Sequence, residues 1–220
     1  MGRRSQHTPE ELRELILTAT RRIVEERGFK ALSAREIARE IGYAPGTLYN
    51  MFKNLDEILL RVESRVLEDL DSHIGKALLN SKQHELPRAF AQAYVDFAYD
   101  HPRLWDLIQF HHPDFDKSVP EWYLDAAYGP MMRLEPIVGD ALGIDDAEEI
   151  TQRSRLLWSV IHGIVQTATT PKLGAVEKST TVWMIESIIA DCLRKQNPNS
   201  IRLRIEPAEN GAAKRERRAG

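Results

Sequence analysis

The chain has 220 residues, of which 42% are hydrophobic and 29% are charged. These proportions are ordinary for a soluble globular protein of one or two small domains. No apolar run approaches the roughly 18 residues that a membrane span needs, and the charged N-terminus lacks the apolar segment of a signal peptide. The single cysteine, Cys192, excludes an internal disulfide, so we expect a cytoplasmic protein with no membrane partner.

The net charge of −3 is unevenly distributed along the sequence. Residues 1–53 carry a net charge of +3 and residues 194–220 carry +5, whereas residues 54–193 carry −11. A small positive excess also arises by chance, but here it coincides with the helical motif at the N-terminus. A basic N-terminal region on an acidic body is typical of a protein that contacts phosphate with one domain only.

The N-terminal region predicts a unit of short helices. A first amphipathic helix is expected between Thr8, which is typical of a helix cap, and Gly28, which is typical of a helix end. A second helix is expected from Ala34, because Ser33 and Glu36 have the S-x-x-E spacing of a capping box.

The next residues predict a turn and a third helix. Gly42 is expected to end the second helix, since glycine adopts the left-handed conformation without a steric penalty. A third helix should open at Pro45, which is tolerated only in a first turn. Leu48 and Phe52, four residues apart, then face inward. Two short helices joined by a tight turn are the helix-turn-helix that places a recognition helix in a DNA groove.

The remainder predicts further helices and no strand. Asn54 is typical of a helix cap, and the apolar spacing after it predicts a long helix to about Leu79. Residues 122–142 predict one helix that is interrupted at Gly129-Pro130 and bent near Pro136. The other helices are expected over residues 86–101, 104–108, 145–170 and 176–195. The fold class is therefore all-α, with about nine helices.

The chain is expected to comprise three parts. Residues 1–55 form a helix-turn-helix DNA-binding domain, and residues 56–196 form a helical domain for effector binding and dimerisation. Residues 197–220 contain two prolines and a KRERR cluster but little apolar content, which predicts a disordered basic tail.

The stretch GFKALSAREIAREIGYAPGTLYNMFKNLDEIL resembles the N-terminal DNA-binding domain of the TetR family of transcriptional regulators. The resemblance covers residues 8 to 62 and implies a DNA-binding homodimer, usually a repressor, whose fourth helix carries the ligand signal. The family usually has a lysine where this chain has Leu55, which removes one expected phosphate contact and leaves Lys53 as the nearest substitute. The matching positions are Gly28-Phe29, Ile37-Ala38, Gly42, the run Gly46-Thr47-Leu48-Tyr49, and Phe52.

The predicted DNA contacts lie on and beside the third helix. Thr47 offers a hydroxyl and a methyl group to base edges, and Arg35 is a candidate phosphate contact. The resemblance makes Tyr49 the main backbone contact, and the alternative is that Tyr43 and Tyr49 only cover the small core. The predicted DNA-binding residues are Arg35, Tyr43, Ala44, Pro45, Gly46, Thr47, Tyr49, Asn50 and Lys53.

The last two helices predict a dimer interface. Both are apolar over a wide face, and two such helices from each of two subunits form a four-helix bundle. Gly163 indicates close helix packing, and Trp158, His162 and Gly163 resemble the WHG-type C-terminal domain found in part of the TetR family. The alternative is an intramolecular core. The predicted interface residues are Trp158, Ile161, Gly163, Val165, Val182, Ile185 and Ile189.

Aromatic residues are concentrated in the middle of the chain. A cavity lined by them and a few polar groups would hold a small apolar or aromatic effector. The family resemblance, and not the spacing, favours a cavity, because aromatics at helical spacing are otherwise core residues. The predicted pocket residues are Phe97, Trp105, Ile108, Phe110, His111, Trp122, Tyr123, Trp158 and His162.

An enzyme is the rival class. His111, His112 and Asp114 are metal-ligand types, which would suit a metal-dependent hydrolase or a metal sensor. Adjacent histidines in a proline-broken loop point apart, however, and metal sites need ligands on fixed elements. We therefore expect no catalysis, no metal and no cofactor.

The sequence thus predicts a ligand-responsive DNA-binding transcriptional regulator. It is expected to repress from a palindromic double-stranded operator as a homodimer and to be released by a small apolar or aromatic effector. The alternative is an effector-independent DNA-binding regulator with a filled C-terminal core.

Overall fold

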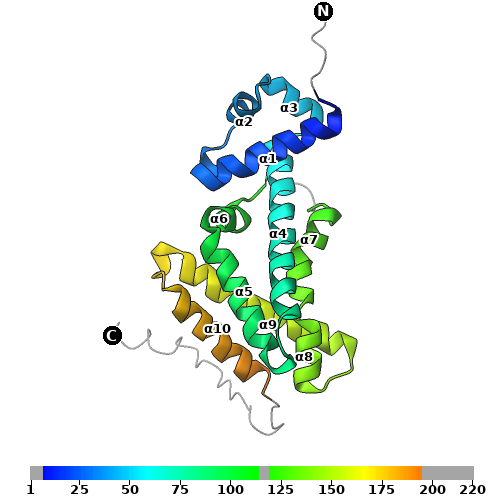
Figure 1. The fold of residues 1–220 in the computed structure, drawn as a ribbon, viewed down its shortest axis with the longest axis vertical. Coiled ribbons are helices and arrows are strands. Elements are labelled where there is room, and N and C mark those ends of the chain that lie inside the picture. Colours follow the sequence, from blue (N-terminus) through cyan, green and yellow to red (C-terminus); the bar gives the residue numbers. More distant parts are fainter. Residues whose placement is uncertain (1–6, 114–118, 195–220) are drawn as a thin grey trace, which may run out of the picture.

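The computed structural model describes residues 7–113 and 119–194 (Figure 1). Within these ranges the chain forms ten α-helices and three short 3₁₀ helices, and no strand. The expected all-α fold class is therefore confirmed. The predicted tail, residues 197–220, lies outside the described residues.

Three helices form a compact head at one end of the molecule (Figure 1): α1 (Pro9–Arg27), α2 (Ala34–Ile41) and α3 (Pro45–Met51). The Thr8 hydroxyl accepts from the backbone N–H of Glu11, and the Glu11 carboxylate accepts from the backbone N–H of Thr8, so both ends of a capping box are made. Gly42 ends α2 with φ of 73°, a left-handed conformation that glycine adopts without strain.

The second capping box is only half formed. The Ser33 side chain accepts from the backbone N–H of Glu36, as the S-x-x-E spacing predicts. The Glu36 carboxylate does not return to Ser33, because it pairs with Arg27 of α1 at 3.0 Å. This charged contact fixes α2 against α1 and outweighs the local cap.

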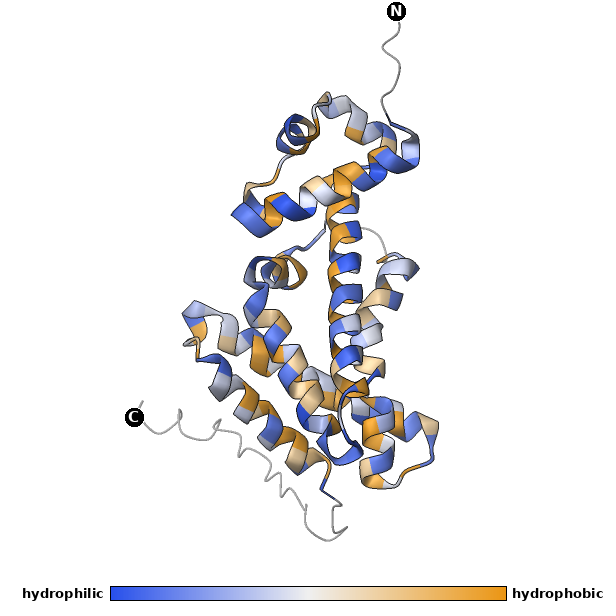
Figure 2. Cartoon of the chain, viewed as in Figure 1, coloured by the Kyte–Doolittle hydropathy of each residue, from blue (hydrophilic) through white to orange (hydrophobic). Residues whose placement is uncertain are grey.

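Helix α4 (Leu55–Leu79) is the longest in the described chain and runs from the head to the far end of the molecule (Figure 1). The Asn54 side chain caps it by accepting from the backbone N–H of Glu57 at 2.9 Å. Apolar and polar residues alternate in patches along its whole length (Figure 2), as expected for a helix with one buried face. It packs against α1 in the head and against α5 and α7 in the body.

Six further α-helices form the body around α4, and three 3₁₀ helices connect elements of the chain. The α-helices are α5 (Leu86–Asp100), α6 (Pro102–Phe110), α7 (Glu121–Met132), α8 (Glu135–Leu142), α9 (Ala147–Thr169) and α10 (Lys178–Cys192). The 3₁₀ helices are η1 (Phe29–Ala31), η2 (Gln83–Glu85) and η3 (Pro171–Leu173).

One predicted helix is in fact two. Residues 122–142 were expected to be interrupted at Gly129-Pro130, but α7 continues through Pro130 and the break falls at Arg133 and Leu134. Pro136 lies in the first turn of α8, where its missing N–H costs nothing. Arg133 at the break donates to both carboxylate oxygens of Asp71 on α4, at 2.8 and 2.7 Å, which fixes the corner.

Head and body share one hydrophobic core. A single cluster of buried apolar side chains extends from α1 and α3 along α4 into α5, α9 and α10. Helix α4 begins at Leu55 and contributes to both regions of this core. The boundary expected between residues 55 and 56 therefore falls in the first turn of a shared helix. No helix among the described residues combines the length and the apolar character that crossing a membrane requires.

Candidate nucleic-acid interface and effector site

Two buried side chains fix the orientation of α3. Leu48 is fully buried and Phe52, just after the helix, is 3% exposed. They turn the opposite face of the helix outward, where the Tyr49 ring is 54% exposed and Asn50 is also exposed. The exposure shows that Tyr49 is not a residue of the small core.

The start of α3 carries little bulk. Ala44, Pro45 and Gly46 are exposed, and Thr47 is half-buried. A side chain added at Gly46 would meet no atom within 4 Å, so the backbone here is open to a close approach. A surface without bulky side chains suits close contact with a DNA backbone, because contacts to phosphate groups fix the position of a protein on the duplex.

Two positive side chains of the helix-turn-helix region, one at the start of α2 and one after α3, make no ion pair within the described structure. Arg22 pairs with Glu40 and Arg27 pairs with Glu36, so the cations at the junction of α1 and α2 are neutralised. Arg35 and Lys53 are exposed and make no ion pair among the described residues. Their charges therefore remain available for phosphate groups.

Two further head residues, Tyr43 and Leu55, make contacts within the protein. The Tyr43 hydroxyl lies 2.6 Å from His7 Nδ1, which connects the start of the described chain to the turn between α2 and α3. Leu55, at the position where the TetR resemblance suggests a lysine, packs against the hydrophobic core. Leu55 thus serves packing and leaves no cation at this position.

The nine predicted effector residues do not form one group. Trp105, Trp158 and His162 come together around Tyr94, whose ring lies 5.5 Å from that of Trp105 and 5.0 Å from that of Trp158. His111, Trp122 and Tyr123 gather about α4. Of the other three, Phe97 is 4% exposed and lies beside His101, Ile108 packs on the core, and Phe110 is 40% exposed.

A chain of hydrogen bonds crosses the first group. Burial lowers the pKa of His162, which favours a neutral ring. Its Nε2–H donates to Gln109 Oε1 at 3.0 Å, and its Nδ1 accepts from the Tyr94 hydroxyl at 2.7 Å. Trp105 Nε1 and Gln109 Nε2 are buried donors without a partner in the described structure. The rings of Tyr94, Trp105, Trp158 and His162 pack against one another in this first group.

The second group is centred on a buried carboxylate. Glu63 of α4 is 1% exposed, lies 2.5 Å from His111 Nδ1 and accepts from the Tyr123 hydroxyl at 2.9 Å. His111 Nε2 lies 3.4 Å from Asp56. Burial by itself lowers the pKa of His111, but the hydrogen bonds and charges of Glu63 and Asp56 outweigh it, so the pKa is raised. The raised pKa favours the protonated imidazole, which can donate to both carboxylates of α4.

Glu63 was missed in the sequence, although a signal was present. It lies four residues after Leu59 and three before Val66, in the middle of the apolar stripe of α4. A carboxylate at such a position is buried, and a buried charge requires a partner. We name Glu63, His111, Tyr123 and Asp56 the Glu63 network.

Helix α6 joins this network to the head. The His111 ring at its C-terminal end lies 6.3 Å from the ring of Phe29. At its N-terminal end Arg103 donates to the backbone carbonyls of Glu25 and Glu26 in the last turn of α1. A cation at the C-terminus of a helix stabilises the helix dipole. The head is thus held at two points by α6 as well as by α4.

The structure corrects most of the predicted dimer side chains. Val182 is 8% exposed, and Ile161, Val165, Ile185 and Ile189 are 0–2% exposed, so all five face the core of their own subunit. Trp158 also points inward, since its ring contacts Tyr94. Gly163 faces open space, because a side chain added there would meet nothing within 4 Å.

The described residues do not bring the candidate metal ligands together. His111 is occupied by the Glu63 network, His112 is exposed, and Asp114 lies outside the described residues. In the part of the chain that the structure describes, no group of three or more His, Cys, Asp and Glu side chains could hold a metal ion.

Two family models match the sequence over the regions that these helices occupy. Residues 16–62 match the model for bacterial regulatory proteins of the tetR family, and residues 88–187 match the model for the tetracyclin repressor-like C-terminal domain. The chain belongs to the TetR family of transcriptional regulators. TetR proteins carry a DNA-binding helix-turn-helix, which here is α2 and α3, ahead of a ligand-binding helical domain.

Solved structures share this TetR fold at low sequence identity. A protein of unknown function from Rhodococcus sp. RHA1 is 21% identical with a TM-score of 0.65, over 85% of this chain and 96% of that one. FadR from Bacillus subtilis, solved in complex with stearoyl-CoA, is 16% identical with a TM-score of 0.61, over 84% and 99%. The TetR-family regulator PfmR from Thermus thermophilus is 19% identical with a TM-score of 0.55, over 83% and 98%.

Removal of two side chains from α3 is expected to abolish tight DNA binding without unfolding the head. Tyr49→Ala combined with Thr47→Ala should weaken binding at least about tenfold, because each substitution removes a hydrogen-bonding group from the exposed face. Fluorescence anisotropy with DNA selected by the wild-type protein measures the affinity, and circular dichroism checks the helix content.

Tyr128→Ala is the matched control, since Tyr128 is 44% exposed on α7 in the body. It should leave DNA affinity unchanged. Equal affinities of the wild type and the α3 double variant would contradict the assignment of this face.

The Glu63 network predicts a pH-dependent contribution to stability. Folding raises the pKa of His111, so protonation of this residue stabilises the folded state. This stabilisation is complete below the pKa of His111 in the unfolded chain, about 6.5, and is lost as the pH rises through its pKa in the folded protein. His111→Gln should therefore lower the free energy of unfolding by about 1.5–3 kcal/mol at low pH, the value of hydrogen bonds to charged groups, and by less at high pH. Urea unfolding at about pH 6 and about pH 9 measures the difference.

His112→Gln, at the exposed neighbouring histidine, should show no such pH dependence. A destabilisation by His111→Gln that is equal at both pH values would show that His111 does not bridge the carboxylates as a cation.

Proposed function

We propose that this chain is a ligand-responsive repressor that binds a palindromic operator as a homodimer. The observation that carries the proposal is the exposed face of α3, where Tyr49 and Asn50 face outward. Lys53 just after this helix and Arg35 at the start of α2 add exposed charges that make no ion pair among the described residues. One recognition helix reads few base pairs, so a two-fold dimer on two half-sites gains both affinity and length of site.

The proposed dimer face lies on α9 and α10, on the side away from the core. Leu156 is 63% exposed and Trp183 is 65% exposed, which is unusual for large apolar side chains on otherwise well-packed helices. Gly163 gives α9 a surface without a side chain, so a partner helix can approach it closely. This face replaces the buried residues that the sequence suggested.

The proposed mechanism is an equilibrium between two states. In one state the two α3 helices match successive major grooves, and in the other α4 has moved and the spacing no longer fits. A ligand shifts this equilibrium only by binding the second state more tightly. The effector should therefore bind free protein more tightly than operator-bound protein.

The proposed effector is a small apolar molecule bound in the body. B. subtilis FadR was solved with stearoyl-CoA, which supports the capacity of this fold for ligands with a long aliphatic chain. The predicted contacts Trp105 and Phe97 are packed against other rings, so an effector at those positions would have to displace them. The packed rings favour a second candidate function, a regulator with no effector.

Selection of DNA from a random library by the full chain tests the function directly. The enriched sequences should contain two inverted half-sites whose centres lie about 10 base pairs or a multiple apart. Trp183→Asp places a charge in the proposed dimer face, so light scattering should show a monomer and the selected DNA should bind at least about tenfold more weakly.

Tyr128→Asp is the control, because it adds the same charge at an exposed aromatic residue on α7. It should remain dimeric and keep its DNA affinity. No enrichment of any sequence, or tight binding of a single half-site by a monomer, would overturn the proposal.

A further inference from the structure

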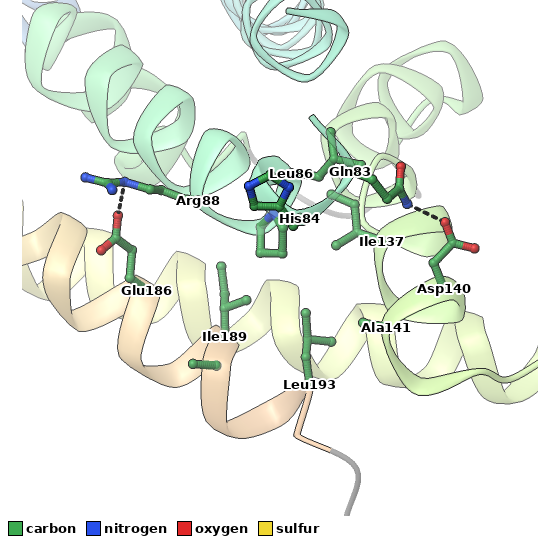
Figure 3. A pocket seen from close by; sticks show the side chains of 12 residues that line it. Gln83, His84, Leu86, Arg88, Ile137, Asp140, Ala141, Glu186, Ile189 and Leu193 are labelled. Atoms are coloured by element: carbon green, nitrogen blue, oxygen red, sulfur yellow. Dashed lines mark hydrogen bonds and ion pairs between the residues drawn. The ribbon is translucent and has the colours of Figure 1, made fainter. Parts of the chain in front are cut away.

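A cleft of about 640 Å³ opens at the end of the body farthest from the head (Figure 3). Its walls are η2, the start of α5, α8 and the last turns of α10. The volume falls in the range of small-molecule sites, about 300–1,000 Å³. None of the nine residues predicted from the sequence as effector contacts lines it.

The floor of the cleft is aliphatic. In Figure 3 Ile189 and Leu193 project from α10 towards Leu86 and Ile137 on the opposite walls. No Phe, Tyr or Trp contributes to the lining, and its aromatic ring is the polar imidazole of His84, so the aliphatic floor offers an aromatic ligand no apolar ring to stack on. The apolar residues that carry this argument are Leu86, Pro87, Ile137, Ala141, Ile189 and Leu193.

Two polar pairs stand at the two ends of the cleft, and the His84 ring lies between them in Figure 3. Arg88 pairs with Glu186 at 3.0 Å at one end, and Gln83 donates to Asp140 at 2.5 Å at the other (Figure 3). The rim thus holds two carboxylates, one guanidinium that is already engaged by one of them, and the imidazole of His84, and it is net negative when that imidazole is neutral. An anionic head group would meet a net negative rim, whereas a neutral or cationic one would find acceptors.

The position of the cleft connects it to the recognition helix. The wall η2 follows the C-terminal end of α4 after only three residues, 80–82. The N-terminal end of the same helix also follows α3 after three residues, 52–54. Helix α4 spans about 37 Å at 1.5 Å per residue, so a small displacement at η2 becomes a displacement of the head at the other end.

We propose that this cleft is the effector site and that it takes an aliphatic ligand whose polar end is neutral or positively charged. The size and the aliphatic floor select a chain-like ligand, and the acidic rim excludes a carboxylate or phosphate head. The ligand moves η2 against α8 and α10, and α4 carries that movement to α3. The regulatory consequence rests on the proposed function, whereas binding to the cleft does not.

Calorimetric titration of the full chain with 1-decanol, decylamine and decanoate, each below its micelle concentration, tests the site. Decanol and decylamine should bind once per chain, and decanoate at least about tenfold more weakly because of like-charge repulsion at the rim. Ala141→Trp and Ala190→Trp both project a ring into the cleft, and each should weaken binding of decanol at least about tenfold by steric exclusion.

Ala175→Trp adds the same ring in an exposed segment outside the cleft and should bind decanol like the wild type. Ala190 is exposed, so its variant remains informative if Ala141→Trp fails to fold. Four results would overturn the site: no binding, binding that neither cleft variant weakens, tightest binding of decanoate, or binding only after residues 195–220 are deleted. The last result would assign the cleft to the chain's own C-terminal segment.

The same samples separate the site from the proposed function. Decanol should weaken binding of the selected DNA at least about fivefold in the wild type and in Ala175→Trp, but not in the cleft variants. Decanol binding without any effect on DNA affinity would overturn the cleft as the effector site. A chain that selects no DNA but binds decanol would contradict the proposed function and leave the ligand site in place.

Discussion

The fold depends on one helix that belongs to two hydrophobic regions. The first turns of α4 bury Ile58 and Val62, and its later turns bury Leu70 and Ile74 along one continuous stripe. α4 packs on α1 in the head and on α5 and α7 in the body, so neither region completes its core without it. Because packed cores change between discrete arrangements and do not bend continuously, a tilt of α4 in the body imposes a new position on the head.

Buried and half-buried charges hold that helix in register with the body. Glu63 lies inside the stripe and is bound by His111 of the α6 end and by Tyr123 of α7, while Asp71 further along binds Arg133. These contacts resist sliding of α4 along its neighbours, since breaking a buried pair leaves an uncompensated charge. Both ends of α6 also contact the head. These contacts therefore hold α4 as a rigid unit between the head and the body.

Local signals in the sequence predicted much of this structure. Thr8, Gly42 and Asn54 act through residues next to them, so the start of α1, the end of α2 and the start of α4 were predictable without tertiary information. The position of the recognition helix followed from its own apolar spacing and from the TetR resemblance. The interruption expected at Gly129-Pro130 falls instead at Arg133 and Leu134, closer to the bend expected near Pro136. Its position depends on the contact of Arg133 with Asp71 of α4, which no local signal shows.

What the sequence missed depends on contacts between distant segments. Ile161 and Val165 are as apolar as interface residues, and only the packing of α9 on α5 shows that they face their own subunit. The cleft is formed by three separate parts of the chain, so no window of sequence contains it. Trp183 is the opposite case, an aromatic residue that lies outside the apolar stripe of α10 and is 65% exposed.

The spacing of the two recognition helices is the most direct test of this account. Arg39 is exposed on α2 and lies outside the proposed DNA contacts, so Arg39→Cys in a Cys192→Ser chain gives one spin label per head. Pulsed electron paramagnetic resonance then measures the distance between the two heads of the dimer. One narrow distance is expected on operator DNA, and a different distance is expected when a ligand has released the DNA. Release of DNA with an unchanged distance would contradict this expectation.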